Sequence, residues 1–267
     1  MQIGIIGCGN MGSALARRLS KEHSLFLYDH RPEKIQKLEA EGLGKATASL
    51  QEVLHLSEAV ILAVKPQSLE QLVAQMTDPI SSDLSIVSLL AGVSISTLRT
   101  YFPKQFLMRM MPNIAVAYGE GVVGLTADPT MPQNKKKQLS EAFKNLGQVH
   151  WIAEEKMNAL TSLTGSGPAF CFAIIEAMIE AGIVMGFPAP LAKELVYQTL
   201  QGSLSLLIHT GKHPEELKWE VASPKGTTIA GLKKLEESDL RGAIINTFLA
   251  AYARGNELSL EKRGEKA

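Results

Sequence analysis

The sequence is poor in cysteine and carries no excess of charge of either sign. Its 267 residues include only 2 cysteines, Cys8 and Cys171, which excludes a disulfide framework and a cysteine-rich metal site. Lys plus Arg and Asp plus Glu number 27 each, so the chain lacks the basic excess that nucleic-acid-binding proteins normally show. With 45% hydrophobic residues it can bury a core, and its length fits one large domain or two ordinary ones.

Targeting signals and long apolar runs are missing as well. No basic segment followed by an apolar run and a cleavage site opens the chain, so we expect no secretory signal. The longest apolar run, at residues 169–175, is ended by Glu176 and Glu180 and is too short to span a bilayer. We therefore expect a cytoplasmic protein that binds neither membranes nor nucleic acids.

Histidine is scarce, with 6 residues in the chain. His209 and His213 have helical spacing, but Gly211 and Pro214 argue against one shared helix face, so no zinc pair is expected. No Ser/His/Asp or Cys/His arrangement suggests itself either. We expect no metal ligands, and we expect chemistry for which a cofactor supplies the reactive group, such as hydride transfer.

The first part of the chain alternates short apolar runs with helical patterns. This alternation predicts a parallel sheet with helices on both faces. The predicted strands are 3–6, 25–28, 59–64, 84–89, 106–110, 122–127 and 148–153, and the predicted helices are 10–20, 32–41, 67–76, 95–102 and 132–146.

After Ile152 the strand-like runs stop, and helical spacing of apolar residues continues almost to the end. We therefore place a domain boundary here, with one domain at residues 1–152 and an all-helical domain at 153–267. The later helices are apolar on more than one face, which indicates burial against a second chain.

A glycine-rich loop follows the first predicted strand. Gly7, Gly9 and Gly12 have G-x-G-x-x-G spacing between a strand and a helix, and Asp29 follows Gly7 by about 20 residues. Such glycines allow a tight turn, close approach of a pyrophosphate and close packing of helix on strand. The amides that open the helix at Asn10 then face the anion. The stretch predicts a dinucleotide site.

Residues 29–31 give conflicting signals about the coenzyme. Asp29 can accept hydrogen bonds from the ribose hydroxyls and repel a 2′-phosphate. Arg31 and His30 can instead bind that phosphate, while a solvated Arg31, or one stacked on adenine, is an equal alternative. The sequence leaves the choice between NADH and NADPH open.

Two further segments follow predicted strands. Residues 63–66 (AVKP) lie where carboxyl ends of strands line the ligand crevice, although Lys65 is equally an ordinary surface lysine. Residues 109–113 (RMMPN) end another strand at the same edge, or form only a strand-ending turn.

Two segments of the helical half stand out. In residues 164–170 (TGSGPAF), Pro168 must break or kink the helical pattern. In residues 222–232 (ASPKGTTIAGL), we expect Ser223 and Pro224 to end one helix and Thr227 and Thr228 to begin another as capping-type residues. A helix start with hydroxyls and free amides can bind a carboxylate, but alone this stretch favours ordinary capping.

Together, IGCGNMG, AVKP, MPN, TGSGPAF and SPKGTTIAGL resemble the pyrroline-5-carboxylate reductase family over nearly the whole chain. The resemblance implies reduction of 1-pyrroline-5-carboxylate to L-proline, the last step of proline biosynthesis, with NADPH, or NADH as the alternative. It implies an α/β fold: an N-terminal Rossmann-type doubly wound parallel sheet and an all-helical C-terminal domain for substrate binding and dimerisation. Family members often assemble such dimers into decamers.

The resemblance also implies roles for individual residues. Thr228 is the candidate catalytic residue, with a hydroxyl that accepts a hydrogen bond from the iminium N–H of the substrate. Lys225 replaces a family glycine, which carries a backbone cost if the position has φ > 0 or adds attraction for a carboxylate. Thr164 replaces a serine. The substrate-binding set is Ser223, Gly226, Thr227 and Thr228, and the cofactor-binding set is Ile6, Gly7, Gly9, Asn10, Met11, Asp29, His30, Arg31, Ala63, Val64, Lys65 and Pro66.

Two alternatives stay open at this point. A β-hydroxyacid dehydrogenase shares the glycine loop and a helical second domain, but that class needs a lysine one helical turn after its second glycine-rich helix start, and none follows Gly165. A non-catalytic relative that binds nucleotide without turnover is the other, because Lys225 and Thr164 depart from the family pattern.

Overall fold

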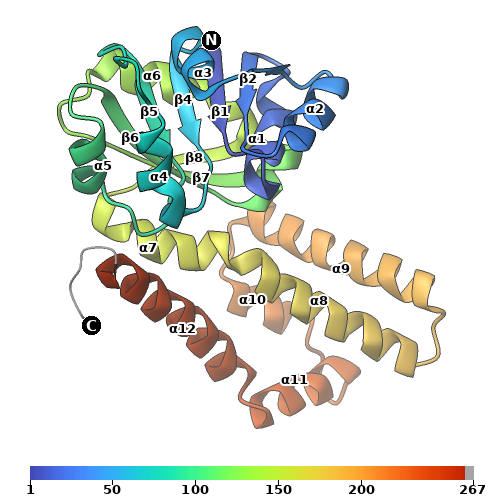
Figure 1. The fold of residues 1–267 in the computed structure, drawn as a ribbon. Helices are drawn as coiled ribbons and strands as arrows, with labels where there is room; N and C mark the ends of the chain where they lie inside the picture. Colours follow the sequence, from blue (N-terminus) through green and yellow to red (C-terminus); the bar gives the residue numbers. More distant parts are fainter. Residues whose placement is uncertain (262–267) are drawn as a thin grey trace. The chain divides into compact units, whose positions relative to one another are not determined.

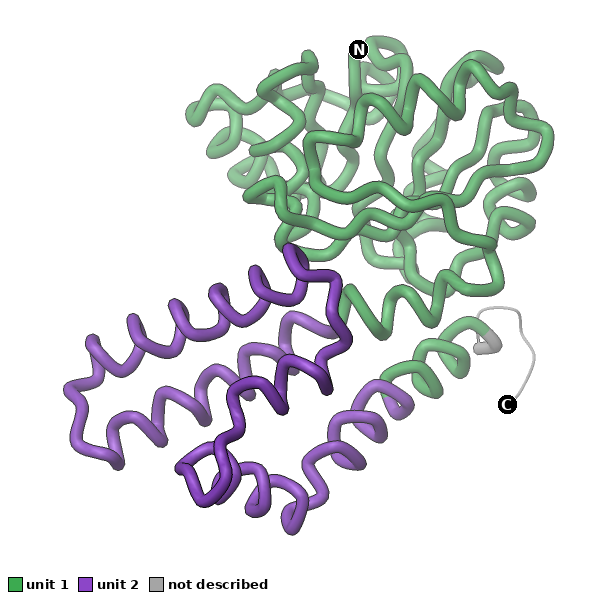
Figure 2. The backbone as a smooth tube through the Cα atoms, turned by 180° about the vertical axis from the view of Figure 1, so that it is seen from behind, with its two compact units in different colours: residues 1–166, 251–267 green, residues 167–250 purple. Residues whose placement is uncertain are grey.

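A computed structural model describes residues 1–261 of the chain. The chain forms two compact units: unit 1 combines residues 1–166 with the segment that starts at 251, and unit 2 comprises residues 167–250 (Figure 2). Unit 2 is therefore an insertion in the sequence of unit 1. This division follows contacts within the chain, and the functional division at residue 152 stays a prediction.

Unit 1 is built on one sheet, whose eight strands within the described residues have the order β3-β2-β1-β4-β5-β6-β7-β8. The pairs from β3 to β6 are parallel, which gives the strand order of a Rossmann fold and confirms the predicted fold class. The last two strands differ from the prediction, because β7 pairs antiparallel with β6 and parallel with β8. The strands are β1 (Gln2–Ile6), β2 (Ser24–Tyr28), β3 (Lys45–Ala46), β4 (Ala59–Leu62), β5 (Ser85–Ser88), β6 (Phe106–Pro112), β7 (Gly121–Ala127) and β8 (Gly147–Trp151).

Helices cover both faces of this sheet (Figure 1). Alternate strand residues point to opposite faces: Ile61 packs in one cluster of buried side chains, whereas Val60 and Leu62 pack in another. The first cluster contains residues of α1 (Asn10–Leu19), α2 (Pro32–Ala40) and α6 (Gln133–Ala142), and the second contains residues of α3 (Leu50–Leu56), α4 (Leu69–Ala74) and α5 (Ile95–Tyr101).

The helical pattern around residues 157–187 is interrupted before Pro168, as predicted. After α7 (Met157–Leu160), residues Thr161–Gly165 form a π-helical turn, and α8 (Gly167–Val184) begins with Pro168 in its first turn. The amide of Ser166 donates to the carbonyl of Thr161 at 3.0 Å, the wider spacing of a π-turn. Pro168 lies where its missing N–H breaks no helical bond.

Unit 2 contains α8, α9 (Ala189–Thr210), α10 (Pro214–Glu220), α11 (Thr227–Glu237) and the first part of α12 (Leu240–Glu261). Its helices bury little within one chain. The fully buried residues of α8 and α9 are Gly167, Gly182, Ala192 and Val196. Large apolar side chains on α8, α9 and α12 are exposed, among them Phe172, Leu204, Leu206, Ile208, Ile245 and Leu249.

The stretch Glu154–Val184 is long and apolar enough to cross a membrane by length and composition alone. The expectation that Glu176 and Glu180 leave too short a run is therefore wrong on this criterion. The criterion is weak, since helices that pack against other protein pass it as well. Only 11% of the apolar window is buried inside this chain, so the stretch has an open apolar surface.

Candidate functional site

The glycine loop lies at the carboxyl end of the sheet, where β1, β2 and β4 meet. Gly7 has φ of 100°, and a Cβ there would lie 2.7 Å from the carbonyl carbon and oxygen of Ala63. The amide of Gly7 donates to Tyr28 at 2.8 Å, and the amide of Ala63 donates to Ile6 at 2.8 Å. Only glycine fits this turn, which packs directly against the segment after β4.

The other two glycines of the loop have different roles. A Cβ on Gly12 would collide with the carbonyl oxygen of Gly7, so glycine here lets α1 pack onto the turn. Beside Gly9 no atom lies within 4 Å of a Cβ position, so this side of the loop is open. Gly9 caps α1 without a side-chain hydrogen bond, which leaves first-turn amides from Asn10 and Met11 onward available to an anion.

The AVKP segment lies beside this loop. Ala63 and Val64 are half-buried directly after β4, and Lys65 is exposed. Pro66 begins a single 3₁₀ turn, Pro66–Ser68, for which Lys65 is the N-terminal cap. Because β4 pairs with β1, the segment borders the same end of the sheet as the glycine loop.

The three residues after β2 complete this cluster. The Asp29 carboxylate accepts the backbone N–H of Cys8 at 2.7 Å and that of Arg31 at 3.0 Å. The His30 and Arg31 side chains are 81% and 52% exposed, whereas that of Asp29 is 5% exposed. Burial, with the negative charge of Asp29, raises the pKa of the Cys8 thiol to about 12, so this thiol stays protonated and unreactive at neutral pH.

The structure thus brings the predicted cofactor-binding residues together at one edge of the sheet. The RMMPN segment serves a different purpose. Arg109 is buried in an ion pair with Glu154 at 3.0 Å. Asn113 exchanges two hydrogen bonds with Val122, through its amide at 3.2 Å and its side-chain oxygen at 3.1 Å. Residues 109–112 therefore form the end of β6, with Pro112 still paired to Val123 of β7, and Asn113 begins the connection to β7.

The segment of residues 222–232 belongs to unit 2. Helix α10, which the sequence reading did not separate, ends at Glu220, so Ser223 and Pro224 lie beyond its end. The predicted helix start is confirmed, because Thr227 and Thr228 are the first two residues of α11, but the N-cap is Gly226 and not a threonine. A Cβ on Gly226 would collide with the hydroxyl of Ser223, so a larger residue there would force the Ser223 side chain to move.

The start of α11 has free hydrogen-bonding groups. No side chain caps it, and among the described residues the hydroxyls of Thr227 and Thr228 have no hydrogen-bond partner. Thr227 is exposed and Thr228 is half-buried. The backbone of Lys225 has φ of 62°, which confirms that this position uses the left-handed conformation.

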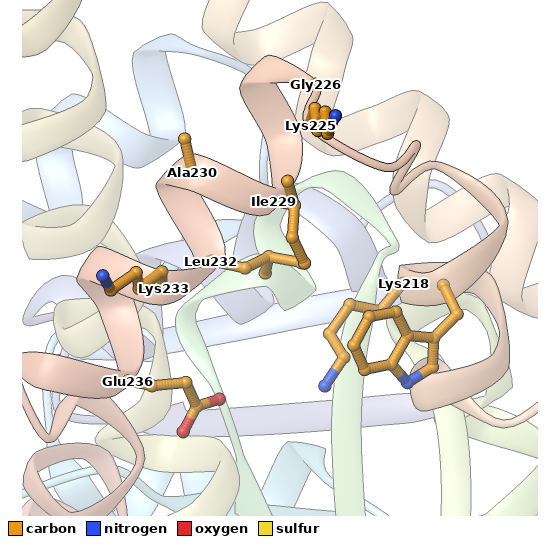
Figure 3. A pocket seen from close by; sticks show the side chains of 9 residues that line it. Lys218, Lys225, Gly226, Ile229, Ala230, Leu232, Lys233 and Glu236 are labelled. Carbon is orange, nitrogen blue, oxygen red and sulfur yellow. The ribbon is translucent and has the colours of Figure 1, made fainter.

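The same loop borders a hollow of about 510 Å³ between α10 and α11 (Figure 3). Ile229 and Leu232 of α11 line one side, and Lys218 and Trp219 of α10 line the other. Lys225, Lys233 and Glu236 add charge at its rim. The hollow is mainly apolar with a basic margin.

Comparison with known proteins identifies the family. The chain is 35% identical to pyrroline-5-carboxylate reductase of Synechocystis sp., over 97% of this chain and 98% of that protein. The chain belongs to the pyrroline-5-carboxylate reductase family. It is also 33% identical to the Pisum sativum enzyme, over 96% of each chain. Residues 154–258 match the family model for pyrroline-5-carboxylate reductase dimerisation, and residues 2–92 match that for NADP oxidoreductase coenzyme F420-dependent.

The fold agrees with this assignment. A crystal structure of Plasmodium falciparum pyrroline carboxylate reductase with NADP bound superposes with a TM-score of 0.89, at 26% identity, over 97% of this chain and 98% of that one. The resemblance drawn from the motifs is thereby confirmed. The chain is assigned to this reductase family and not to the β-hydroxyacid dehydrogenases. The match at 154–258 also indicates that the chain forms homo-oligomers.

Proposed function

We propose that this chain catalyses the reduction of 1-pyrroline-5-carboxylate to L-proline, the last step of proline biosynthesis. The observation that carries the proposal is the family's substrate loop, Ser223–Thr228, with an uncapped helix start and a free Thr228 hydroxyl. The same chain also holds an open glycine loop at the end of a Rossmann sheet. Catalysis by hydride transfer requires both elements.

The residues around the glycine loop fit a nicotinamide dinucleotide. Gly9 leaves room beside the backbone, and the uncapped start of α1 offers amides to a pyrophosphate. The coenzyme, which supplies a hydride when it is bound, is proposed to be held by residues 29–31, by residues 63–66, and by Ile6, Gly7, Gly9, Asn10 and Met11. NADPH is the proposed main coenzyme because Arg31 and His30 present exposed cationic or hydrogen-bonding groups, and NADH is the alternative.

The substrate is proposed to bind at the start of α11. Backbone amides of Thr227 and Thr228 suit its carboxylate, since helix N-termini attract anions, whereas the Gly226 amide already donates to the Ser223 carbonyl at 3.1 Å. The free hydroxyl of Thr228 suits the protonated imine, whose N–H it can accept. This bond favours the charged, electrophilic form of the imine, and the protein contributes mainly orientation and proximity.

The proposed assembly is a homodimer formed through the C-terminal helices, with a decamer of such dimers as the larger form. The supporting observations are the match at 154–258 and the exposed apolar side chains of α8, α9 and α12. A second copy, and not a membrane, is proposed to cover the stretch Glu154–Val184. In this proposal residues 1–152 bind the coenzyme, residues 153–267 bind substrate and the partner copy, and the protein is cytoplasmic.

The proposed activity is tested by coenzyme oxidation with pyrroline-5-carboxylate, in parallel with NADPH and NADH, and by detection of L-proline. We expect turnover with both coenzymes and a higher kcat/KM with NADPH. Coenzyme binding without oxidation at saturating substrate would contradict the proposal and favour the non-catalytic relative.

The proposed assembly is tested by light scattering after size-exclusion chromatography without detergent. We expect at least a dimer at micromolar concentration. Phe172→Glu, on an exposed face of α8, should weaken the dimer because it places a charge in an apolar contact. Tyr118→Glu is the matched control, since Tyr118 is an exposed aromatic residue of unit 1. A monomer at this concentration would contradict the proposal.

A further inference from the structure

We propose that Asp29 is a positioning residue that holds the glycine loop, and that the coenzyme's 2′-phosphate is selected by His30 and Arg31 without opposition from this carboxylate. The inference rests on the proposed use of a nicotinamide coenzyme. In many dinucleotide-binding folds an acidic residue at this place accepts the ribose hydroxyls and disfavours NADPH. The geometry of this chain assigns the acidic residue a different task.

Both oxygens of the Asp29 carboxylate are engaged within the protein. Oδ2 accepts the N–H of Cys8 at 2.7 Å, and Oδ1 accepts the N–H of Arg31 at 3.0 Å. The Nδ1 atom of His30 lies 3.2 Å from Oδ1 as well. With 5% of the side chain exposed, little of the carboxylate surface remains for a ribose hydroxyl.

These two bonds join two loops that both border the proposed coenzyme site. Cys8 lies between Gly7 and Gly9, and Arg31 is the N-cap of α2. Cys8 is buried, so its amide has no water to replace the carboxylate if this partner is lost. The bond from the Gly7 amide to the Tyr28 carbonyl runs beside the first one. Asp29 thus fixes the glycine loop against the end of β2.

The same arrangement leaves the choice between NADPH and NADH to the side chains of His30 and Arg31. The negative charge of Asp29 faces the backbone N–H groups of Cys8 and Arg31, and Nδ1 of His30 and Nε of Arg31 lie 3.2 Å and 3.9 Å from Oδ1. The His30 imidazole and the Arg31 guanidinium are largely exposed at the surface of the same loop. An exposed guanidinium can form charge-assisted hydrogen bonds with a phosphate monoester but gains little from a ribose hydroxyl.

The first test is calorimetric titration of Asp29→Asn with NADP⁺ and with NAD⁺. Asparagine keeps one acceptor oxygen and turns an N–H₂ group toward the other amide. We expect both Kd values to rise together, by about 10-fold, which is the loss of one charge-assisted hydrogen bond. A Kd ratio that shifts tenfold toward NADP⁺ would show instead that the carboxylate repels the phosphate, and would overturn the proposal.

The second test is Arg31→Ala, which keeps both hydrogen bonds to Asp29 because they come from the backbone N–H groups of Cys8 and Arg31, and which removes the Nε atom that lies 3.9 Å from Oδ1. We expect the Kd for NADP⁺ to rise about 10-fold and that for NAD⁺ to stay within about twofold. Equal effects on both coenzymes would contradict the role given to Arg31. Since these are binding measurements, they remain informative even if the protein proves to lack turnover.

A third measurement reports on the loop itself. In a Cys171→Ser background, the thiol of Cys8 should react slowly with a thiol reagent, and Asp29→Asn should accelerate the reaction because the loop loses its anchor. A reaction rate unchanged by Asp29→Asn, together with unchanged Kd values, would show that Asp29 does not position the loop.

Discussion

The guanidinium of Arg109 donates to the carboxylate of Glu154 across 3.0 Å and joins β6 to the turn that precedes α7. The same carboxylate oxygen accepts the amide of Ile95, the first residue of α5, at 2.7 Å. Burial lowers the pKa of Arg109, and the bond to Glu154 opposes this effect. One carboxylate therefore links a central strand, a covering helix and the segment that leads to the helical unit.

Glu154→Gln should destabilise the protein because it leaves a buried guanidinium without an anionic partner. Since the Glu154 side chain is 36% exposed, we expect about 1–3 kcal/mol, less than for a fully buried pair. Urea unfolding gives the value. Glu155→Gln is the control, because Glu155 is an exposed neighbour that should change stability by no more than about 0.5 kcal/mol. If both variants lose the same unfolding free energy, the ion pair of Arg109 and Glu154 does not stabilise the protein.

Thr228→Ala should impair the chemical step more than coenzyme binding. A hydrogen bond to a charged group contributes about 1.5–3 kcal/mol, so kcat/KM should fall roughly 10- to 150-fold. The Kd for NADPH should stay within about twofold, since only the substrate is expected to use this bond. Thr228→Ser keeps the oxygen and should retain much of the activity. If serine fails as badly as alanine, the imine is held elsewhere.

Lys225→Gly should stabilise the protein and weaken substrate binding at the same time. Lysine at φ of 62° carries backbone strain that glycine does not. Left-handed backbone costs about 1–2 kcal/mol in non-glycine residues, partly offset by the greater freedom of unfolded glycine. We expect a higher Tm and a higher KM for pyrroline-5-carboxylate at low salt. Lys225→Asn removes the charge but tolerates this φ, so an unchanged KM in both variants would rule out an attraction for the carboxylate.

Asp128 should contribute stability that is lost in acid. Burial alone would raise the pKa of this carboxyl, but hydrogen bonds from Thr130 and Arg99 outweigh it and lower the pKa to about 2 from 3.8. Because the folded pKa is depressed, the contribution is present above about pH 4 and disappears as the pH falls toward 2. Asp128→Asn should therefore be less stable than the parent at neutral pH, and the difference should narrow in acid. A difference independent of pH would contradict this assignment.

The sequence was sufficient to predict most strands and helices of unit 1, because apolar residues in buried strands and amphipathic helices recur at short, regular spacings. The direction of β7 was missed although a signal existed. Parallel neighbours need a crossover of roughly a dozen residues or more. Residues 113–120, which join β6 to β7, are too few for a helix that crosses the sheet. Strand β3 was missed because two residues, Lys45 and Ala46, show no alternation.

Helix α3 was missed despite a readable signal. Ser49 and Glu52 have the spacing of a capping box: the Ser49 hydroxyl accepts the amide of Glu52 at 3.2 Å, and the Glu52 carboxylate accepts the amide of Ala48, one residue before the N-cap, at 2.7 Å.

Within the candidate site, the glycine loop could be predicted because Gly7 and Gly12 lie where a Cβ would collide with backbone atoms of the local turn. The orientation of Asp29 could not. Its carboxylate binds an amide 21 positions earlier in the chain, and no local pattern encodes this contact. The cap of α11 was assigned to a threonine because hydroxyl residues usually occupy that position, whereas the structure has Gly226 there, with the Ser223 hydroxyl in the space that a Cβ would fill.

Unit 1 is built from two segments of the chain, residues 1–166 and the segment that starts at 251, so the ribosome makes its parts at different times. The side chain of Asn158 donates to Asn256 and to Ser259 at 3.0 Å each, 98 and 101 positions further along. A ribosome completes all strands of the sheet before it makes these partners, and at about 5–20 residues per second the delay is roughly 5–20 s. During that interval the nascent chain carries a finished sheet beside a helix whose polar partners do not yet exist.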